Sequence, residues 1–247
     1  MLPILYQDAQ LVAVDKPAGL LVHRTGLDAG ETRFAVQWLR QQIGRPVWPV
    51  HRLDKGTSGV LLFALDASCA ATLAQDWAGG GVRKTYVAMV RGWPPAAGLI
   101  DHPLARLPDD ARGARGLERQ PALTRFRTLA RLALPLPDRG FAQTRCARIE
   151  LQPDTGRRHQ LRRHCKHMAH PIIGDATHGK GALNRAVAAL LGSQRLWLHA
   201  QSLVLRHPVS GAPLHIEAAP GPEWALWAPW TPTWCDAPRH AASRSDI

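Results

Sequence analysis

A single carboxylate stands among basic residues in the stretch HRLDKGTSG, residues 51–59. Asp54 lies between Arg52 and Lys55 and is followed by a turn-forming run and by the apolar strand expected over residues 59–65. A carboxylate on a tight loop beside a strand is a common placement for a general base or a nucleophile. The two neighbouring cations favour its charged form. Asp54 is therefore the first candidate for a catalytic residue.

Two other interpretations of this stretch bear on that candidate. Asp54 could serve the turn alone, by accepting hydrogen bonds through Thr57 and Ser58, as aspartates in turns often do. The order His-Arg-Asp is also the signature of a kinase catalytic loop, but Leu53 interrupts it, and no DFG follows. The glycines of AGGGV, residues 78–82, lack the spacing of a nucleotide-binding loop and indicate the end of a helix.

A second basic cluster, TGRRHQLRRHCKHMAHPIIGD, covers residues 155–175. The pattern predicts a helix from about residue 159 to residue 167. Arg158 and Arg162 are expected one turn apart on one face, where they could bind a phosphate or a carboxylate. The plainer interpretation is a basic helix that faces solvent.

The same cluster suggests a metal site, because it contains His159, His164, His167, His170 and Cys165. Their spacing matches no standard zinc pattern. On the expected helix, Cys165 also lies on a different face from the two neighbouring histidines. No metal is therefore expected.

Most of the elements that would position these residues are strands. Tyr86, one of two tyrosines, lies on an alternating stretch where it could equally be a half-buried packing residue. The expected strands are residues 10–14, 59–65, 84–92, 146–153, 202–208 and 213–220, with a hairpin turn at Ser210-Gly211, and the expected helices are residues 32–44 and 68–80. Strands and helices do not alternate regularly, which predicts an α+β fold with a largely antiparallel sheet.

Local signals set the expected boundaries. Thr32 is placed to cap the helix over residues 32–44, and Gly44 to end it. Residues 105–145 are rich in arginine and predict an irregular surface excursion. We expect one catalytic domain over residues 1–228 and a poorly ordered tail over residues 229–247.

Composition points to the partner. The chain of 247 residues carries 31 Lys plus Arg against 19 Asp plus Glu, a formal net charge of +12. Such an excess is typical of nucleic-acid binding, although a coding bias toward arginine and alanine would also produce it. No apolar run is long enough for a membrane span. Four scattered cysteines without a CxxC pair predict a reduced, cytoplasmic protein.

Five stretches occur in an order that identifies a family. They are DKPAGLLVH (residues 15–23), HRLDKGTSGVLLFA (51–64), KTYVAMVRG (84–92), the basic cluster (155–175) and RLWLHAQSLVLRHP (195–208). Together they resemble the successive motifs of the RluA-type pseudouridine synthases. The combination of HRLDxxTSG with a downstream TGRxHQxRxH is highly specific. The resemblance implies a pseudouridine synthase fold, a mixed sheet flanked by helices around a central catalytic cleft.

The resemblance also implies residue roles. Asp54 corresponds to the catalytic aspartate, Tyr86 to the tyrosine that contacts the uracil, and Arg162 to the arginine that pairs with the aspartate. Arg52 corresponds to the arginine that helps to flip the target base. The other expected RNA-binding residues are Lys55, Arg158 and His159.

The implied reaction is isomerisation of uridine in RNA. The C1′–N1 bond breaks, the uracil turns, and C5 joins C1′, so no redox change occurs and neither cofactor nor metal is expected. The carboxylate either attacks the sugar or the ring or takes the C2′ proton, and both routes stay open. Within the family, ILYQDAQLVAVDKPAGLLVHRT and LHIEAAPG are most similar to members that modify the uridine at position 65 in the T-arm of transfer RNA. Ribosomal RNA or several transfer-RNA sites are the alternative substrates.

Two interpretations from other classes remain. A non-catalytic RNA-binding protein would not need Asp54, Tyr86 and Arg162 together, and a metal-dependent hydrolase would need the histidine cluster to hold a metal. No membrane association and no obligate protein partner are expected, and a monomer is predicted, with no separate RNA-binding domain before residue 4.

Overall fold

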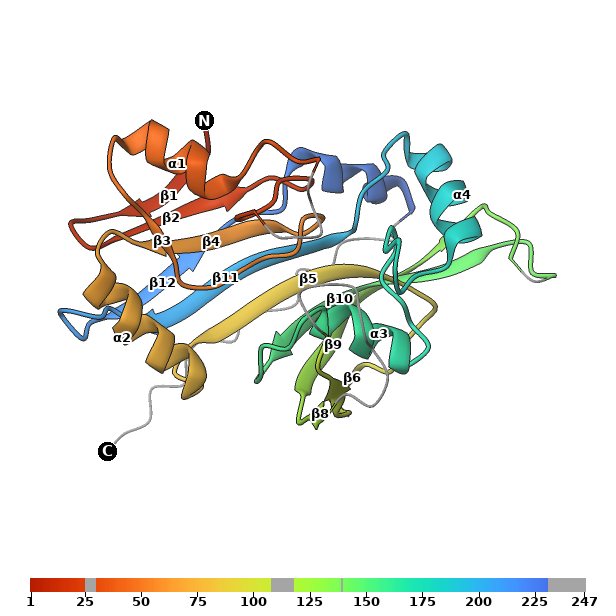
Figure 1. The fold of residues 1–247 in the computed structure, drawn as a ribbon. Coiled ribbons are helices and arrows are strands. Elements are labelled where there is room, and N and C mark those ends of the chain that lie inside the picture. Colours follow the sequence, from red (N-terminus) through yellow and green to blue (C-terminus); the bar gives the residue numbers. More distant parts are fainter. Residues whose placement is uncertain (25–29, 108–117, 139, 231–247) are drawn as a thin grey trace.

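One mixed sheet forms the body of the protein, with helices on both faces (Figure 1). The computed structural model describes residues 1–24, 30–107, 118–138 and 140–230. The strand order is β1-β2-β4-β11-β5-β10-β9-β6, with β12 beside β11 and β3 beside β4. The pair β4 and β11 is parallel, and the other pairs of this sheet are antiparallel. The α+β prediction is therefore confirmed.

The strands of the sheet are β1 Ile4–Gln7, β2 Leu11–Lys16, β3 Trp48–Pro49, β4 Ser58–Ala64, β5 Arg83–Arg91, β6 Ala97–Asp101, β9 Leu123–Leu134, β10 Thr144–Pro153, β11 Leu198–Arg206 and β12 Pro213–Glu217. A separate pair contains β7 Leu104–Ala105 and β8 Arg119–Gln120. The helices are α1 Ala35–Ile43, α2 Ala67–Ala78, α3 Gln160–His167 and α4 Gly181–Leu191, and a 3-10 helix, η1, covers Pro222–Trp230.

The N-terminal half of the sheet is covered on both faces. All seven residues of β4 are buried, which explains why this strand is a continuous apolar run. Neighbouring residues of a strand point to opposite faces. Leu61 and Phe63 of β4 accordingly pack with α1, while Val60 and Leu62 pack with α2.

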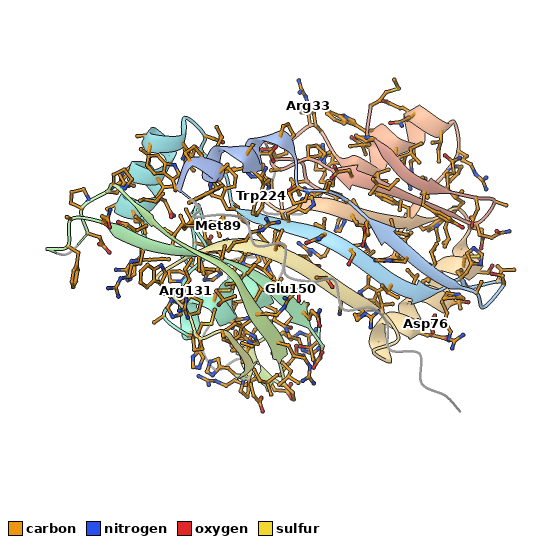
Figure 2. All side chains as sticks on the ribbon, turned by 180° about the vertical axis from the view of Figure 1, so that it is seen from behind. Arg33, Asp76, Met89, Arg131, Glu150 and Trp224 are labelled. Carbon is orange, nitrogen blue, oxygen red and sulfur yellow. The ribbon has the colours of Figure 1, made fainter. Side chains whose placement is uncertain are left out.

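The other half follows the same rule around β5 and β10. Ala88 and Val90 of β5 pack against α3, whereas Val87 and Met89 pack on the opposite side with α4 and η1. Met89 and Trp224 lie together in this second layer when the molecule is seen from behind (Figure 2). Helix α3, which carries part of the second basic cluster, thus lies on one face of the sheet, and α4 and the tryptophan-rich η1 lie on the other.

The parallel pair joins the two halves at the start of β4. Ser58 lies opposite His199 and Gly59 opposite Ala200. Gly59 has a φ of 109°, and a Cβ built there would lie 2.1 Å from the Ala200 carbonyl oxygen. Only glycine permits this approach, so the last residue of the HRLDKGTSG stretch fixes the loop to the centre of the sheet.

The expected cap of α1 is wrong in one respect. Phe34, not Thr32, occupies the N-cap position, and its side chain makes no capping hydrogen bond. The amides of Ala35 and Val36 instead donate to the carbonyls of Leu21 and Val22, at 2.8 and 3.1 Å. A preceding loop therefore satisfies the free helix amides, while Gly44 ends the helix in the left-handed conformation as predicted.

The prediction of irregular structure over residues 105–145 is also wrong in part. The twelve-residue strand β9 crosses this region and pairs with both β10 and β6. Its outward Arg125 and Arg127 alternate with the buried Thr124 and Phe126, and the exposed arginines obscured a strand pattern. Residues 108–117 and 139 lie outside the described residues.

The expected tail begins within η1, because Pro229 and Trp230 are its last two residues. The remainder, residues 231–247, lies outside the described residues. In the part of the chain that the structure covers, no helix is long and apolar enough to cross a membrane.

Candidate active site

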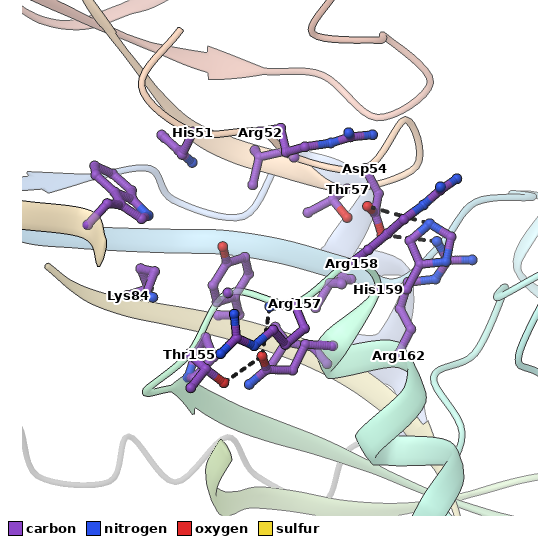
Figure 3. A pocket seen from close by; sticks show the side chains of 18 of the residues that line it. His51, Arg52, Asp54, Thr57, Lys84, Thr155, Arg157, Arg158, His159 and Arg162 are labelled. Atoms are coloured by element: carbon purple, nitrogen blue, oxygen red, sulfur yellow. Dashed lines mark hydrogen bonds and ion pairs between the residues drawn. The ribbon is translucent and has the colours of Figure 1, made fainter. Parts of the chain in front are cut away.

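Asp54 and Arg162 form an ion pair in the wall of a cavity (Figure 3). The Arg162 guanidinium donates from Nη1 to Asp54 Oδ2 at 2.9 Å. The turn after Asp54 is closed by main-chain atoms, since the Thr57 amide donates to the Asp54 carbonyl oxygen at 3.0 Å. The side chain of Asp54 is 20% exposed, so it is accessible from the cavity. Arg162 thus binds the Asp54 carboxylate, while the main chain closes the turn.

A second carboxylate fixes Arg162 from the other side. Asp175 accepts from Nε at 2.7 Å and from Nη2 at 2.8 Å. Burial alone would raise the pKa of Asp175, but its bonds from Arg162 and from the His178 and Thr177 amides outweigh burial and lower the pKa. Burial likewise opposes the charge of Arg162, but the two carboxylates raise its pKa above the ordinary value. Arg162 and Asp175 are therefore both charged at neutral pH.

Helix α3 presents Arg162 because its other polar side chains anchor it. Buried Gln160 accepts from the Thr155 hydroxyl and the Arg157 amide at 2.7 and 2.9 Å, and donates to Leu123 and Thr124 of β9. Five of the eight residues of the helix are buried. The plainer interpretation, a basic helix that faces solvent, is therefore wrong.

The turn before α3 differs from the prediction. The helix begins at Gln160, and His159 has a left-handed backbone with φ 54° and ψ 27°. Arg158 consequently precedes the helix and does not share a helical face with Arg162, although both line the same cavity. A left-handed conformation at a residue other than glycine is uncommon and often marks a functional site.

This backbone places His159 beside the ion pair. Its Nε2 lies 3.8 Å from Asp54 Oδ1, and its Nδ1 lies 3.2 Å from Nε2 of His178. Burial, more than the opposing charge of Asp54, lowers the pKa of His159 to about 4. The imidazole next to Asp54 is therefore neutral near pH 7.

Tyr86 lies in the same cavity, on β5, two strands from β4. The cavity has a volume of about 450 Å³, within the ~300–1,000 Å³ range of small-molecule sites. Burial, and then the charge of Asp54, raise the pKa of the Tyr86 phenol. The hydroxyl therefore keeps its proton at neutral pH. We call this space, which Asp54, Tyr86, Arg162 and Lys84 line, the first cavity.

Arg52 and Lys55 occupy the rim. Arg52 is exposed and lines the first cavity (Figure 3). Lys55 forms an ion pair with Glu31 in which both side chains are more than a third exposed. Such exposed pairs contribute little to stability, so Lys55 is only weakly tied to Glu31.

A buried lysine supports the loop from below. Lys16 is fully buried and its ammonium donates to the carbonyls of Pro17, Leu20 and Lys55 at 2.9, 2.7 and 3.3 Å. Burial lowers its pKa to about 7, and the charges of Asp54 and Asp15 partly oppose this. The DKP stretch therefore holds the backbone next to Asp54.

The sequence reasoning missed Lys16, Asp175 and His178 as site residues. One signal could have found Asp175: it is the only acidic residue between positions 155 and 180, among eight Lys, Arg and His residues up to Met168. A buried arginine needs an anionic partner, and Asp175 was the nearest candidate after the helix.

The histidine cluster does not converge on one point. His164 is buried and bonds Thr124 and the His102 carbonyl, whereas His167 stacks on His102. Cys165 lies in the apolar core. In the described ranges no group of three or more His, Cys, Asp or Glu side chains could hold a metal ion.

Comparison with known proteins agrees with this geometry. The sequence model described as RNA pseudouridylate synthase matches residues 10–167. The chain belongs to the RNA pseudouridylate synthase family, the class of isomerases that convert uridine to pseudouridine.

Individual relatives show which members of the family this chain is similar to. The chain is 48% identical over 227 residues to tRNA pseudouridine synthase C of Vibrio cholerae, covering 91% of this chain and 93% of the relative. It is 46% identical to the Salmonella typhimurium protein of the same name, covering 91% and 87%. Among solved structures, human RNA pseudouridylate synthase domain containing 1 superposes with a TM-score of 0.71 at 26% identity, covering 95% of this chain and 89% of that one.

Proposed function

We propose that this protein isomerises a uridine of transfer RNA to pseudouridine, with Asp54 as the catalytic carboxylate. The main support for this proposal is the position of the Asp54 carboxylate. Arg162 binds it at 2.9 Å, and it lines a cavity that Tyr86 also lines. The names of the similar bacterial relatives support transfer RNA as the substrate. The uridine at position 65 in the T-arm is the proposed target.

The residues divide the work. Arg162 orients Asp54, and the neutral Tyr86 hydroxyl can donate a hydrogen bond to the flipped uracil. Arg52 fills the space that the base leaves and, with Arg158 and Lys55, binds the phosphates. The target must leave its stack because its reacting atoms are inaccessible within a helix.

The atoms of the reaction balance within the substrate. The C1′–N1 bond breaks, C1′–C5 forms, the hydrogen on C5 leaves and N1 gains one. No electrons are exchanged, so the reaction as written needs no cofactor. Asp54 either takes and returns the C2′ proton or forms a transient bond to the substrate.

The test is to incubate purified protein with unmodified transfer-RNA transcript, without added metal or nucleotide, and to map pseudouridine by position. We expect one new pseudouridine in the T-arm, both with and without a chelator. Product in ribosomal RNA but not in transfer RNA would assign the alternative substrate. Dependence on added zinc would support the metal-dependent hydrolase interpretation and contradict this proposal.

A further inference from the structure

A second cavity shares a wall with the first cavity. It has a volume of about 400 Å³. The shared wall consists of the residues that line both, namely Arg52, Leu53, Asp54, Arg158, His159 and Arg162. Tyr86 lines only the first cavity, whereas Leu21, Lys55, Thr177 and Leu196 line only the second. A target base against Tyr86 leaves the second cavity free.

The lining of the second cavity combines cations with an apolar floor. Arg52, Arg158 and Lys55 bring positive charge to it. Its lining carboxylates, Asp54 and Asp175, are both bound by Arg162. Leu21, Val22 and Leu196 provide buried apolar surface. This combination suits a ligand with a phosphate and a flat, partly apolar ring, which is a nucleotide.

The far wall of this cavity is preformed. Asp175 Oδ1 accepts from the amides of Thr177 and His178, each at 2.9 Å. Asn184 accepts from the Gly174 amide and donates to the Asp175 carbonyl, also at 2.9 Å each. The turn therefore keeps its shape, and the ligand meets a rigid site.

The covalent structure of RNA indicates which nucleotide would occupy the second cavity. A flipped uridine in RNA carries a phosphate and a further nucleotide on each side. The second cavity shares a wall with the first. When a target uridine lies in the first cavity, the nucleotide next to it in the same strand can therefore reach the second.

We propose that the second cavity binds the nucleotide next to the target uridine, with its base on Leu21 and Leu196 and the linking phosphate between Lys55 and Arg158. The proposal rests on the proposed function and makes the second cavity a determinant of sequence context. Removing part of the apolar face of a base from water against aliphatic side chains is worth roughly tenfold in affinity.

The first test couples a protein change to an RNA change. Thr177→Trp fills the second cavity while its main-chain hydrogen bond to Asp175 remains, and the RNA stem-loop carries an abasic residue on either the 5′ or the 3′ side of the target. For one of the two abasic positions, we expect the protein change alone and the RNA change alone each to weaken binding about tenfold. We expect the two changes together to weaken binding no further. Ala189→Trp, on the exposed side of α4, is the matched control and should not couple to either abasic site.

The second test avoids a bulky substitution. Lys55→Met is paired with an RNA that carries an uncharged methylphosphonate at the same linkage, and losses that do not add support the phosphate position. Independent losses at both neighbours, in both tests, would overturn the proposal, as would equal coupling to both neighbours. Because both tests measure binding by titration, their result is separate from turnover: failure of wild-type protein to form pseudouridine contradicts the proposed function alone.

Discussion

Arg162 contacts Asp54 with the one terminal nitrogen that Asp175 leaves available. Nε and Nη2 are bound by Asp175, and Nη1 donates to Asp54 at 2.9 Å. The guanidinium is planar and its donors diverge at fixed angles. Asp175 therefore helps to set the position of the Asp54 carboxylate, although Asp175 does not line the cavity that contains Tyr86.

Asp54→Asn removes the charge while keeping the shape. We expect isomerisation to fall to background, whereas melting temperature and RNA affinity stay near wild type, because the turn is closed by main-chain atoms. Tritium release from C5-labelled uridine, beside a filter-binding titration, measures both. Asp101→Asn, an exposed carboxylate on β6, is the control. Tritium release by Asp54→Asn near the wild-type rate would return Asp54 to a structural role.

Arg162→Lys keeps one charge but loses the fork that binds two carboxylates. We expect turnover to fall about 100-fold, because Lys cannot hold Asp54 and Asp175 together. Single-turnover kinetics with saturating enzyme would separate this loss from weaker binding. Near-normal single-turnover rates would show that charge alone is sufficient.

Asp175→Asn tests the partner that sequence reasoning missed. Its carboxylate is buried and neutralises Arg162, so we expect a loss of roughly 3 kcal/mol in the free energy of unfolding. Turnover should fall as well, since Arg162 is free to shift away from Asp54. Denaturant titration and the C5 tritium assay check the two effects. Lower stability with unchanged kcat would make Asp175 purely structural.

Tyr86→Phe deletes only a hydroxyl that stays protonated. We expect turnover to fall roughly 100-fold or more while RNA affinity stays within a few-fold, because the ring is retained and the hydrogen-bond donor is lost. Separate kcat and Kd measurements decide the matter. An unchanged kcat would assign Tyr86 to packing.

Acid should destabilise the fold before it titrates most carboxylates. Burial lowers the pKa of His51 to about 3 and those of His159 and His199 to about 4, against 6.5 for an ordinary imidazole. As pH falls from about 6.5 toward 4, the unfolded chain binds these protons and the folded chain does not. Unfolding therefore becomes easier, by up to ~1.4 kcal/mol per histidine and pH unit.

Melting curves at pH 7 and pH 5 measure this effect. His199→Asn should reduce the drop in melting temperature between the two, although it also lowers stability at pH 7 through the lost bond to Ser58. His215→Asn, on the exposed part of β12, should leave the drop unchanged. An unchanged drop in His199→Asn would contradict the assignment.

The sequence predicted the fold class and the site residues that belong to recognisable motifs. It did not predict local structure that depends on contacts with another part of the chain. Asp54, Tyr86 and Arg162 meet in one cavity as expected. The cap of α1 could not be predicted, because the carbonyls that accept from its first amides belong to Leu21 and Val22, well before the helix in the chain. Arg158 was misplaced because the turn at His159 takes a conformation that local propensity disfavours.

Asp54 and Arg162 are 108 residues apart in the chain. In the folded protein β11 links them, because it pairs with β4, which follows Asp54, and with β5, on which α3 packs. A segment comprising β1 to β4 alone would contain the carboxylate without the arginine. We therefore expect the site to form late in folding, together with the long-range strand pairs, so that catalytic competence reports completion of the whole sheet.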